Sequence, residues 1–508
     1  MSSKSKSAAE NLILLLLGML ATYAYWSIYQ DMDDEAAGTT LGAIRLLKGE
    51  LPYRDWMSRH TPGGQFVTAA YFLIFGSGQL GTRSLMGLIS AITGVLIYQC
   101  SCQVTRSGLR YLPWLLWTCG SITEKAELSH HWFGVIGTIF TFYWTLRWAL
   151  TPGRSTPLWV GFSAALSSWF LQSNGLSSLL MVALVWLRLR PAGLSRVILA
   201  YVATDIVLWA PWLGFAHEVW QNHFQVLGRH IAFNRLPYDW GRLGELASNY
   251  SGLTFSQQPI HFLAGWSHFG RMSILYGLYY LVIAVACGLA EKRRSRPQLA
   301  LAYCSLAWAL TTGYCQTICY ISYAAPAFQL ATLCLLAGRE RWAAVWGVLE
   351  TAGWFFRICS ISLAYCYPIA TRAGTYWGPD PQEAASLNQL HAWIEVHCPK
   401  NSEVLAYPYF AREYSLEFLS NPIPQAFLFP WIFEEHEFVN CAAVLERNQV
   451  PFILRRVLDT SAILVEYPNA PADEIQRDYV RQDQRIFAPY QKIWEVPGFE
   501  VWSRKPRD

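Results

Sequence analysis

Long apolar runs separated by short basic clusters constrain this chain more than any other feature of its sequence. The first run, Asn11–Tyr29, is long enough at about 20 residues to cross a bilayer as a helix. Basic clusters then mark every second crossing, as is typical of cytoplasmic loops; they are Arg106–Arg110, Arg147–Arg154, Arg188–Arg196, Glu291–Arg296 and Arg339–Arg341. The pattern predicts a polytopic α-helical membrane protein with about 11 transmembrane helices, the last of them Trp342–Tyr365.

The composition agrees with a membrane protein. Hydrophobic residues make up 53% of the 508 residues and charged residues only 15%, a balance that soluble domains of this length do not have. The net charge of +4 is too small to indicate a nucleic-acid partner. A cleavable signal peptide is an alternative for the first apolar run. Because no small-residue cleavage site follows it, we expect a retained helix with a cytoplasmic N-terminus.

The crossings divide the chain into a membrane domain, residues 1–366, and a small C-terminal extracytoplasmic α/β domain, residues 367–508. The expected elements of the C-terminal domain are helices Leu387–His397 and Phe438–Arg447, strands Glu403–Tyr407 and Pro451–Arg455, and the hairpin Ile493–Ser503. The membrane domain has three outer loops, residues 30–82, 123–131 and 216–271. The first loop contains two expected helices, Asp34–Lys48 and Pro62–Phe75, and the second of these has the length of an interfacial helix.

An acidic cluster, Asp31–Glu35, follows the first apolar run directly. Carboxylates so close together cannot lie in hydrocarbon, so the cluster must sit just outside the membrane, at the mouth of the helical domain. A purely structural explanation is also open, because acidic residues stabilise a helix start while Arg45 and Lys48 stabilise its end before Gly49. Both explanations can hold together.

The acidic cluster is followed in order by KGELPYRDW, RHTPGG, FLIFG and Arg83. This series resembles the first extracytoplasmic loop of the glycosyltransferase C superfamily, in particular its bacterial integral-membrane branch related to protein O-mannosyltransferases and lipid A aminoarabinose transferases. The resemblance implies an inverting glycosyltransferase of the bacterial inner membrane, with its active site and C-terminus on the outer face. It also implies a polyprenyl-phosphate sugar donor and a lipid, glycan or protein acceptor in the cell envelope.

By the same resemblance, Asp34 is the general base or acceptor-orienting carboxylate, with Glu35 beside it; Asp31 and Asp33 leave the register open. RHTPGG occupies the place of a Lys-Pro-Pro element that lies next to the donor phosphate in relatives, and here the lysine is missing. Arg59 or His60 could replace it, since a nearby cation stabilises the charge that a leaving phosphate gains. Anchoring of these residues to lipid headgroups is the alternative.

The second outer loop contains Glu127, His130 and His131. Adjacent residues of a helix point about 100° apart, so we expect one of the two histidines to face the site. The alternative is a pair of interfacial histidines beside Trp132. Glu124, Glu127 and a histidine could together bind a divalent metal, but their spacing fits no strong motif, so we predict no required metal or cofactor.

Two other functions remain open from the sequence. A lipid-linked saccharide flippase or transporter would place charged or broken helices near the bilayer midplane, where Asp205 is the main candidate. A polysaccharide polymerase or ligase, or a non-catalytic assembly subunit, could have the same fold. Of the 12 cysteines, only Cys398 and Cys441 lie in the polar C-terminal part, where they could pair in an oxidising compartment.

Overall fold

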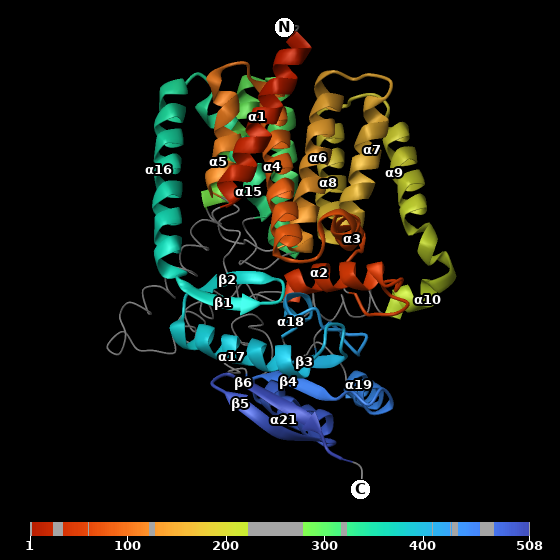
Figure 1. The fold of residues 1–508 in the computed structure, drawn as a ribbon. Helices are drawn as coiled ribbons and strands as arrows, with labels where there is room; N and C mark the ends of the chain where they lie inside the picture. Colours follow the sequence, from red (N-terminus) through yellow and green to blue (C-terminus); the bar gives the residue numbers. More distant parts are fainter. Residues whose placement is uncertain are drawn as a thin grey trace.

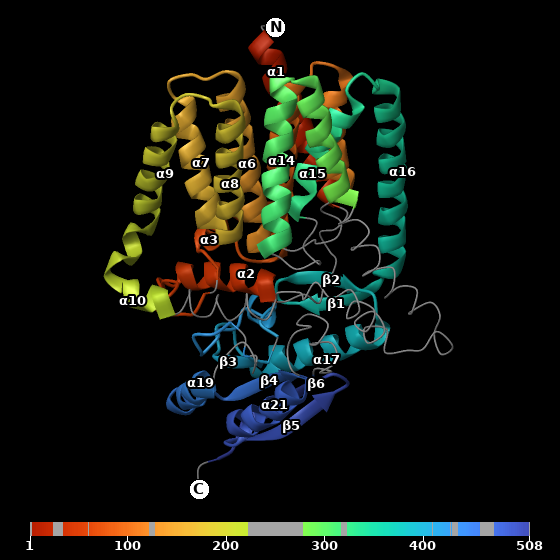
Figure 2. The same ribbon diagram turned by 180° about the vertical axis from the view of Figure 1, so that it is seen from behind.

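A helical bundle stands on a smaller C-terminal unit of helices and short sheets, and the two chain ends lie at opposite ends of the molecule (Figures 1 and 2). The structure is a computed structural model. It describes residues 3–23, 34–58, 60–120, 128–221, 278–315, 323–408, 410–426, 428, 435–457 and 472–506.

The bundle is built from helices that run roughly parallel to one another (Figure 1). They are α1 Ser3–Tyr23, α4 Gln79–Val104, α5 Leu112–Gly120, α6 His130–Leu150, α7 Thr156–Phe170, α8 Gln172–Leu189, α9 Leu194–Trp209, α14 Arg296–Cys315, α15 Ala325–Leu336 and α16 Glu340–Ala364. Residues 278–293 are helical as well. Short helical turns η1 Gly108–Tyr111, η3 Ala210–Phe215 and α10 Ala216–Val219 complete this part. Helix α6 lies at the centre, and Val135, Ile139 and Phe142 on it are 0% exposed.

Two helices, Gln79–Val104 and Leu194–Val219, are long and apolar enough to span a membrane by length and composition, and Ser7–Tyr23, Gly63–Phe75 and Ala325–Leu336 are shorter apolar helices. The count of about 11 spans therefore stays a prediction. The first expected span, Asn11–Tyr29, is helical from Ser3 to Tyr23, and its last residues lie outside the described part. The expected third span is short, because α5 has only nine residues.

Helices α2, Asp34–Leu47, and α3, Gly63–Phe75, lie across the end of the bundle that faces the C-terminal unit (Figure 1). Their bounds agree with the two helices expected in the first outer loop. Helix α3 ends at Phe75 because Gly76 adopts a left-handed backbone angle, φ 75°. The two helices cross each other closely, and the candidate site is built around them.

The C-terminal unit contains two sheets. Strands β1, Tyr367–Thr371, and β2, Gly374–Gly378, form an antiparallel hairpin directly after α16. The second sheet has the order β3-β4-β6-β5, in which only β3 and β4 are parallel. Its strands are β3 Val404–Tyr407, β4 Phe452–Arg456, β5 Tyr490–Val496 and β6 Phe499–Arg504, and the helices are α17 Pro381–His397, α18 Glu413–Leu416, α19 Glu435–Arg447 and α21 Ala472–Phe487.

Each element expected in this unit is present, with some bounds shifted. Helix α17 starts six residues before the expected Leu387 because Asp380 caps it, and Asp380 Oδ1 accepts hydrogen bonds from the backbone N–H of Gln382 and Glu383. The β1–β2 hairpin and α21 were not predicted.

Cys398 and Cys441 are both free and buried in separate apolar clusters, so the pairing left open by the sequence does not occur.

Arg45 fixes the C-terminal unit to α2. Its guanidinium is buried and donates hydrogen bonds to the carbonyl oxygens of Ile423 at 2.6 Å, Asn421 at 3.1 Å and Pro424 at 3.3 Å. The backbone N–H of Met57 also donates to the Pro424 oxygen, at 3.1 Å. The sequence assigned Arg45 only to the end of a helix, but its side chain also holds residues 421–424 against α2.

Arg45→Met should loosen this contact, because the apolar side chain leaves three carbonyl oxygens without their charged donor. We expect a loss of about 1–3 kcal/mol of stability, visible as faster hydrogen exchange in residues 421–426. Lys48→Met is the matched control, since Lys48 also reaches this segment, at Ser420 Oγ, but from an exposed position. Equal rates of hydrogen exchange in residues 421–426 of the two variants would show that Arg45 does not hold the C-terminal unit against α2.

Candidate functional site

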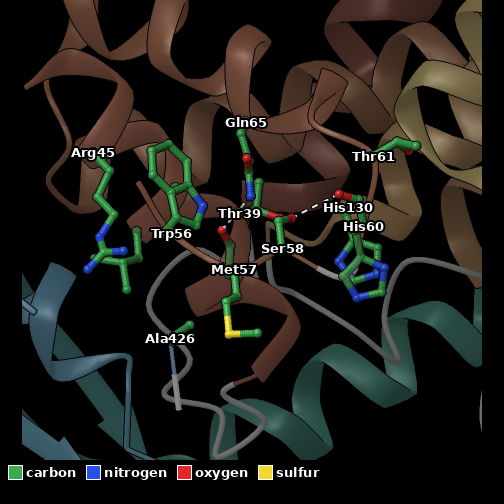
Figure 3. A pocket seen from close by; sticks show the side chains of 13 residues that line it. Thr39, Arg45, Trp56, Met57, Ser58, His60, Thr61, Gln65, His130 and Ala426 are labelled. Atoms are coloured by element: carbon green, nitrogen blue, oxygen red, sulfur yellow. Dashed lines mark hydrogen bonds between the residues drawn. The ribbon is translucent and has the colours of Figure 1, made fainter. Parts of the chain in front are cut away.

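A cavity of about 50 Å³ lies where α2, α3, the loop between them and the start of α6 meet. This volume holds a few water molecules or one small polar group. Ala426 of the C-terminal unit closes one side (Figure 3). The lining residues are Gly38, Thr39, Leu41, Gly42, Arg45, Trp56, Met57, Ser58, His60, Thr61, Gln65, His130 and Ala426.

Three histidines and a tyrosine form a continuous series of ring contacts beside the cavity, stacked at His60–His130 and at His131–Tyr323 and tilted at His130–His131. The ring centroids of His60 and His130 are 3.5 Å apart, those of His130 and His131 4.2 Å, and those of His131 and Tyr323 4.3 Å. His130 and His131 are 4% and 7% exposed. The series joins the loop before α3 to the first turn of α6 and to the segment before α15, so segments distant in the sequence meet here.

The two histidines of α6 lie at the N-terminus of a 21-residue helix. Ser129 is the N-cap, and its Oγ accepts a hydrogen bond from the backbone N–H of His131 at 3.2 Å. The positive end of the helix dipole favours an anion. The start of α6 beside His60 and His130 is therefore suited to an anion such as a phosphate.

The loop that carries His60 is rigidly held. Tyr53 Oη and Ser58 Oγ each donate a hydrogen bond to the His60 carbonyl oxygen, both at 2.8 Å. Tyr53 is 0% exposed and stacks on Trp209 at the end of α9. Trp212 Nε1 donates to the Pro52 carbonyl oxygen at 2.9 Å. The backbone of His60 is therefore held through Tyr53 and Pro52, which contact α9 and η3, and the sequence did not reveal these contacts.

The structure brings together some of the predicted site residues. His60 and His130 meet at the cavity, whereas His131 does not line it and stacks on Tyr323 instead. Asp34 and Glu35 are the first residues of α2, and the side chains of these two residues are outside the described part. Thr39 and Gly42, further along α2, line the cavity. Arg59, Glu124 and Glu127 lie outside the described residues altogether.

Sequence analysis missed several residues of this site, namely Thr39, Ser58, Gln65, Tyr53 and Tyr323. One signal was available. Gln65 interrupts the otherwise apolar run of α3, and an amide at a buried helix position usually has a defined hydrogen-bonding role.

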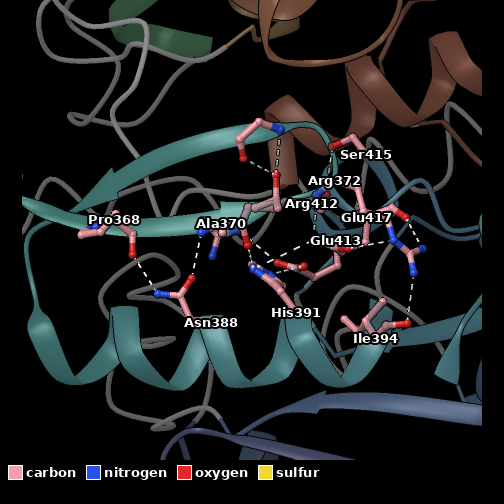
Figure 4. Close-up of polar contacts among 12 residues, drawn as sticks. Pro368, Ala370, Arg372, Asn388, His391, Ile394, Arg412, Glu413, Ser415 and Glu417 are labelled. Atoms are coloured by element: carbon pink, nitrogen blue, oxygen red, sulfur yellow. Dashed lines mark hydrogen bonds and ion pairs between the residues drawn. The ribbon is translucent and has the colours of Figure 1, made fainter. Parts of the chain in front are cut away.

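A second cluster of ionisable groups is buried inside the C-terminal unit (Figure 4). His391 Nδ1 lies 2.9 Å from the Ala370 carbonyl oxygen, and Nε2 lies 2.9 Å from Glu413 Oε2. His391, Glu413 and Glu417 are 4%, 0% and 1% exposed. Both imidazole nitrogens thus face oxygen atoms, an arrangement that favours the doubly protonated ring.

Among the described residues, these three have side chains of the types that bind metal ions, and their candidate ligand atoms lie within 4.8 Å of one another. Two guanidinium groups already lie against its carboxylates. Arg372 Nε is 3.6 Å from Glu417 Oε2, and Arg412 Nε is 3.7 Å from Glu413 Oε1. Because these cations oppose a divalent ion electrostatically, we interpret the cluster as an ionic network that joins α17 and α18 to the β1–β2 turn.

The network predicts a pH-dependent stability. Burial alone lowers the pKa of His391, but the neighbouring Glu413 and Glu417 raise it above its ordinary value. Burial raises the pKa of Glu417 to about 7. Both groups hold protons more strongly in the folded state, so their stabilisation is present at low pH and is lost as the pH rises through their folded pKa values.

We therefore expect the melting temperature of the protein to fall by several degrees between about pH 5 and pH 7.5. Glu417→Gln should remove much of this dependence of the melting temperature on pH. Glu403 is exposed in the same unit, and Glu403→Gln should leave the dependence unchanged. Thermal unfolding in a constant detergent, followed at a series of pH values, measures the effect. Equal slopes in all three proteins would show that Glu417 does not titrate as proposed.

Comparison with known proteins was informative only at the level of structure. No family model matches the sequence, and no curated protein sequence matches it. ArnT from Cupriavidus metallidurans bound to undecaprenyl phosphate is similar with a TM-score of 0.53 and 11% identity, over 100% of both chains. The Archaeoglobus fulgidus oligosaccharyltransferase in complex with Zn and sulfate gives 0.51 and 12% identity, over 97% of this chain and 73% of that chain.

At such low identities these similarities show the fold alone. The fold shared with these two proteins is, in this chain, a helical bundle with a small C-terminal sheet-containing unit.

Proposed function

We propose that this protein is an inverting membrane glycosyltransferase that moves one sugar from a polyprenyl-phosphate donor to an acceptor in the cell envelope. It would belong to the bacterial branch of the superfamily and act on the outer face of the inner membrane, with about 11 membrane helices. One observation supports this most strongly. Helix α2, the His60–His130 pair and the N-terminus of α6 meet at one end of a bundle that shares its fold with a protein solved with undecaprenyl phosphate.

In this proposal the donor phosphate lies at the start of α6, against His60 and His130. Arg59, next to His60 in the sequence, supplies the permanent positive charge that the absent lysine provides in relatives. When the bond between the anomeric carbon and the phosphate oxygen breaks, negative charge grows on the phosphate. Fixed donors at this position stabilise that charge more in the transition state than in the ground state.

The acceptor hydroxyl approaches from the opposite side of the sugar. Asp34 takes its proton while the hydroxyl oxygen forms a bond to the anomeric carbon, and polyprenyl phosphate leaves with the electrons of the broken bond. Glu35 and Glu127 are the further carboxylates proposed near this reaction. The chemistry needs no metal ion when Arg59 and the histidines supply the positive charge. A divalent ion bound by Glu127 and a histidine would provide the same stabilisation.

Product stereochemistry tests the proposal. The purified protein in lipid nanodiscs would be given a polyprenyl-phosphate sugar with a β-linked phosphate, together with cell-envelope acceptors. We expect an α-linked product and one equivalent of polyprenyl phosphate for each sugar transferred. A β-linked product would contradict attack from the opposite face, and an unconsumed donor would contradict transferase activity.

A further inference from the structure

A groove of about 910 Å³ runs between α16 and the segment formed by η1 and α5, at the edge of the bundle (Figure 1). This volume falls in the range of about 300–1,000 Å³ that is usual for small-molecule sites. Both walls are mostly apolar. Leu112 and Leu115 line the groove from α5, and Ala344, Val348 and Ala352 line it from α16. The groove is therefore suited to an apolar ligand or to the apolar part of a larger one.

The groove opens at the surface of the bundle, because Val348 and Phe355 line it and are nevertheless 68% and 65% exposed. Its two walls come together at Gly347, where a Cβ atom would lie 3.1 Å from Leu115 Cδ2. The lining residues Glu340 and Phe355 are 15 positions apart on α16, a rise of about 22 Å. One leaflet accounts for half of a hydrocarbon core of about 30 Å, so the groove is long enough for a lipid acyl chain.

Three arginines lie at one end of the groove. Arg339 and Arg341 flank the lining residue Glu340, and Arg106 lies two residues before η1. All three arginines are exposed, and none of them forms an ion pair with another residue that the structure describes. Their three positive charges exceed the single negative charge of Glu340, so this end of the groove attracts an anion such as a phosphodiester.

A fourth arginine holds the η1 wall in place. Arg110 Nη2 donates hydrogen bonds to Glu10 Oε1 on α1 at 3.2 Å and to Tyr111 Oη at 2.9 Å. Because Glu10 already neutralises Arg110, this arginine is not counted among the groups that attract an anion. The arginine end of the groove lies at the opposite end of the bundle from the C-terminal unit (Figure 1), the end that the basic clusters predict to be cytoplasmic.

We propose that the groove binds one anionic phospholipid of the cytoplasmic leaflet, with an acyl chain between α5 and α16 and its phosphate at Arg106, Arg339 and Arg341. Basic residues at a cleft between membrane helices on the cytoplasmic side are a known setting for anionic headgroups. The acyl chain supplies the contacts that the two apolar walls lack across the groove. Since α16 leads directly into the β1–β2 hairpin, the bound lipid would also stabilise the connection to the C-terminal unit.

The test uses full-length protein in phosphatidylcholine nanodiscs that contain a small fraction of a photoreactive lipid, with a diazirine in one acyl chain. Two such probes are compared, phosphatidylglycerol and phosphatidylcholine. Labelling of residues 343–355 is divided by labelling of residues 198–202 on α9, a second exposed apolar surface. We expect this ratio to be at least about 5-fold higher for the phosphatidylglycerol probe, the effect of one well-placed arginine. Both peptides come from the same protein, so partial unfolding does not mimic the preference.

Two pairs of variants test the headgroup and the acyl chain separately. The double variant Arg339→Gln/Arg341→Gln should bring the ratios of the two probes close together, whereas Arg154→Gln, an exposed arginine in another basic cluster, should keep the preference. Ala344→Phe should displace the acyl chain and lower the phosphatidylglycerol ratio. Val345→Phe should leave it unchanged, because Val345 is 50% exposed on α16 and does not line the groove.

Equal ratios for the two probes in the wild type would overturn the proposal, because the headgroup would then not be recognised. A preference that persists in Arg339→Gln/Arg341→Gln would also overturn it. Labelling of α9 without labelling of residues 343–355 would show that another part of this chain fills the groove instead of a lipid. These measurements need no glycosyl donor, so their failure would leave the proposed function intact.

Discussion

Asp34→Asn is expected to reduce sugar transfer by about 100- to 10,000-fold, the usual contribution of a positioned general base. The amide keeps the size of the carboxylate at the first residue of α2, so the protein should fold and bind its donor normally. The loss should therefore appear in kcat, with the donor KM little changed. Transfer measured over a range of donor concentrations in proteoliposomes separates the two parameters.

Asp33→Asn is the matched control, because it removes a carboxylate from the adjacent residue just before α2. It should cost much less than Asp34→Asn. The reverse order of effects would mean that the register of the catalytic residue is shifted within the acidic cluster. Full activity in both variants would mean that a carboxylate from this cluster is not the base.

Arg59→Ala is expected to weaken donor use by about one to two orders of magnitude. The change removes a charge-assisted hydrogen bond to the phosphate, and such bonds contribute about 1.5–3 kcal/mol. Since the phosphate is bound before and during the reaction, the donor KM should rise and kcat should fall. The measurement is a donor titration at pH 6 and pH 8, at which the arginine carries the same charge.

His60→Ala should behave differently in the same titration. Imidazole groups ordinarily become protonated near pH 6.5, so a histidine that contacts the phosphate contributes more at pH 6 than at pH 8. The alanine also removes the ring that stacks on His130 at 3.5 Å. The exposed His397 in the C-terminal unit provides the control, as His397→Ala. A large, pH-independent loss in His60→Ala together with a normal Arg59→Ala would contradict the assignment.

Local patterns allowed α2 and α3 to be predicted almost to the residue. The acidic start of α2 and the left-handed glycines Gly49 and Gly76 are boundary signals contained in the sequence itself. The β1–β2 hairpin has no comparable signal, because Tyr367–Thr371 contains a proline and lacks a clear apolar alternation. Helix α21, ADEIQRDYVRQDQRIF, is mostly polar but strongly amphipathic, so its hydrophobic periodicity was a signal that the sequence prediction did not use.

The candidate site was harder to predict from local sequence patterns than the helices were. His60, His130 and His131 were individually recognisable, but their stacking depends on how α3 and α6 pack at the end of the bundle. Tyr53 lies in the stretch KGELPYRDW but had no assigned role, and Tyr323 belongs to no quoted motif. Each becomes part of the site through a ring contact with a distant segment. Gln65 could be read as a tolerated polar residue until Gly42 and Gly38 were found beside its amide.

A donor labelled separately in its sugar and in its polyprenyl chain tests the central claim most directly. It would be incubated with wild-type and Asp34→Asn protein in proteoliposomes that contain cell-envelope acceptors. If the protein is a transferase, the two labels separate with the wild type, as the sugar moves to an acceptor and polyprenyl phosphate is left, and they stay together with Asp34→Asn. Labels that stay together with the wild type while the donor crosses the bilayer would instead identify a transporter and contradict the account.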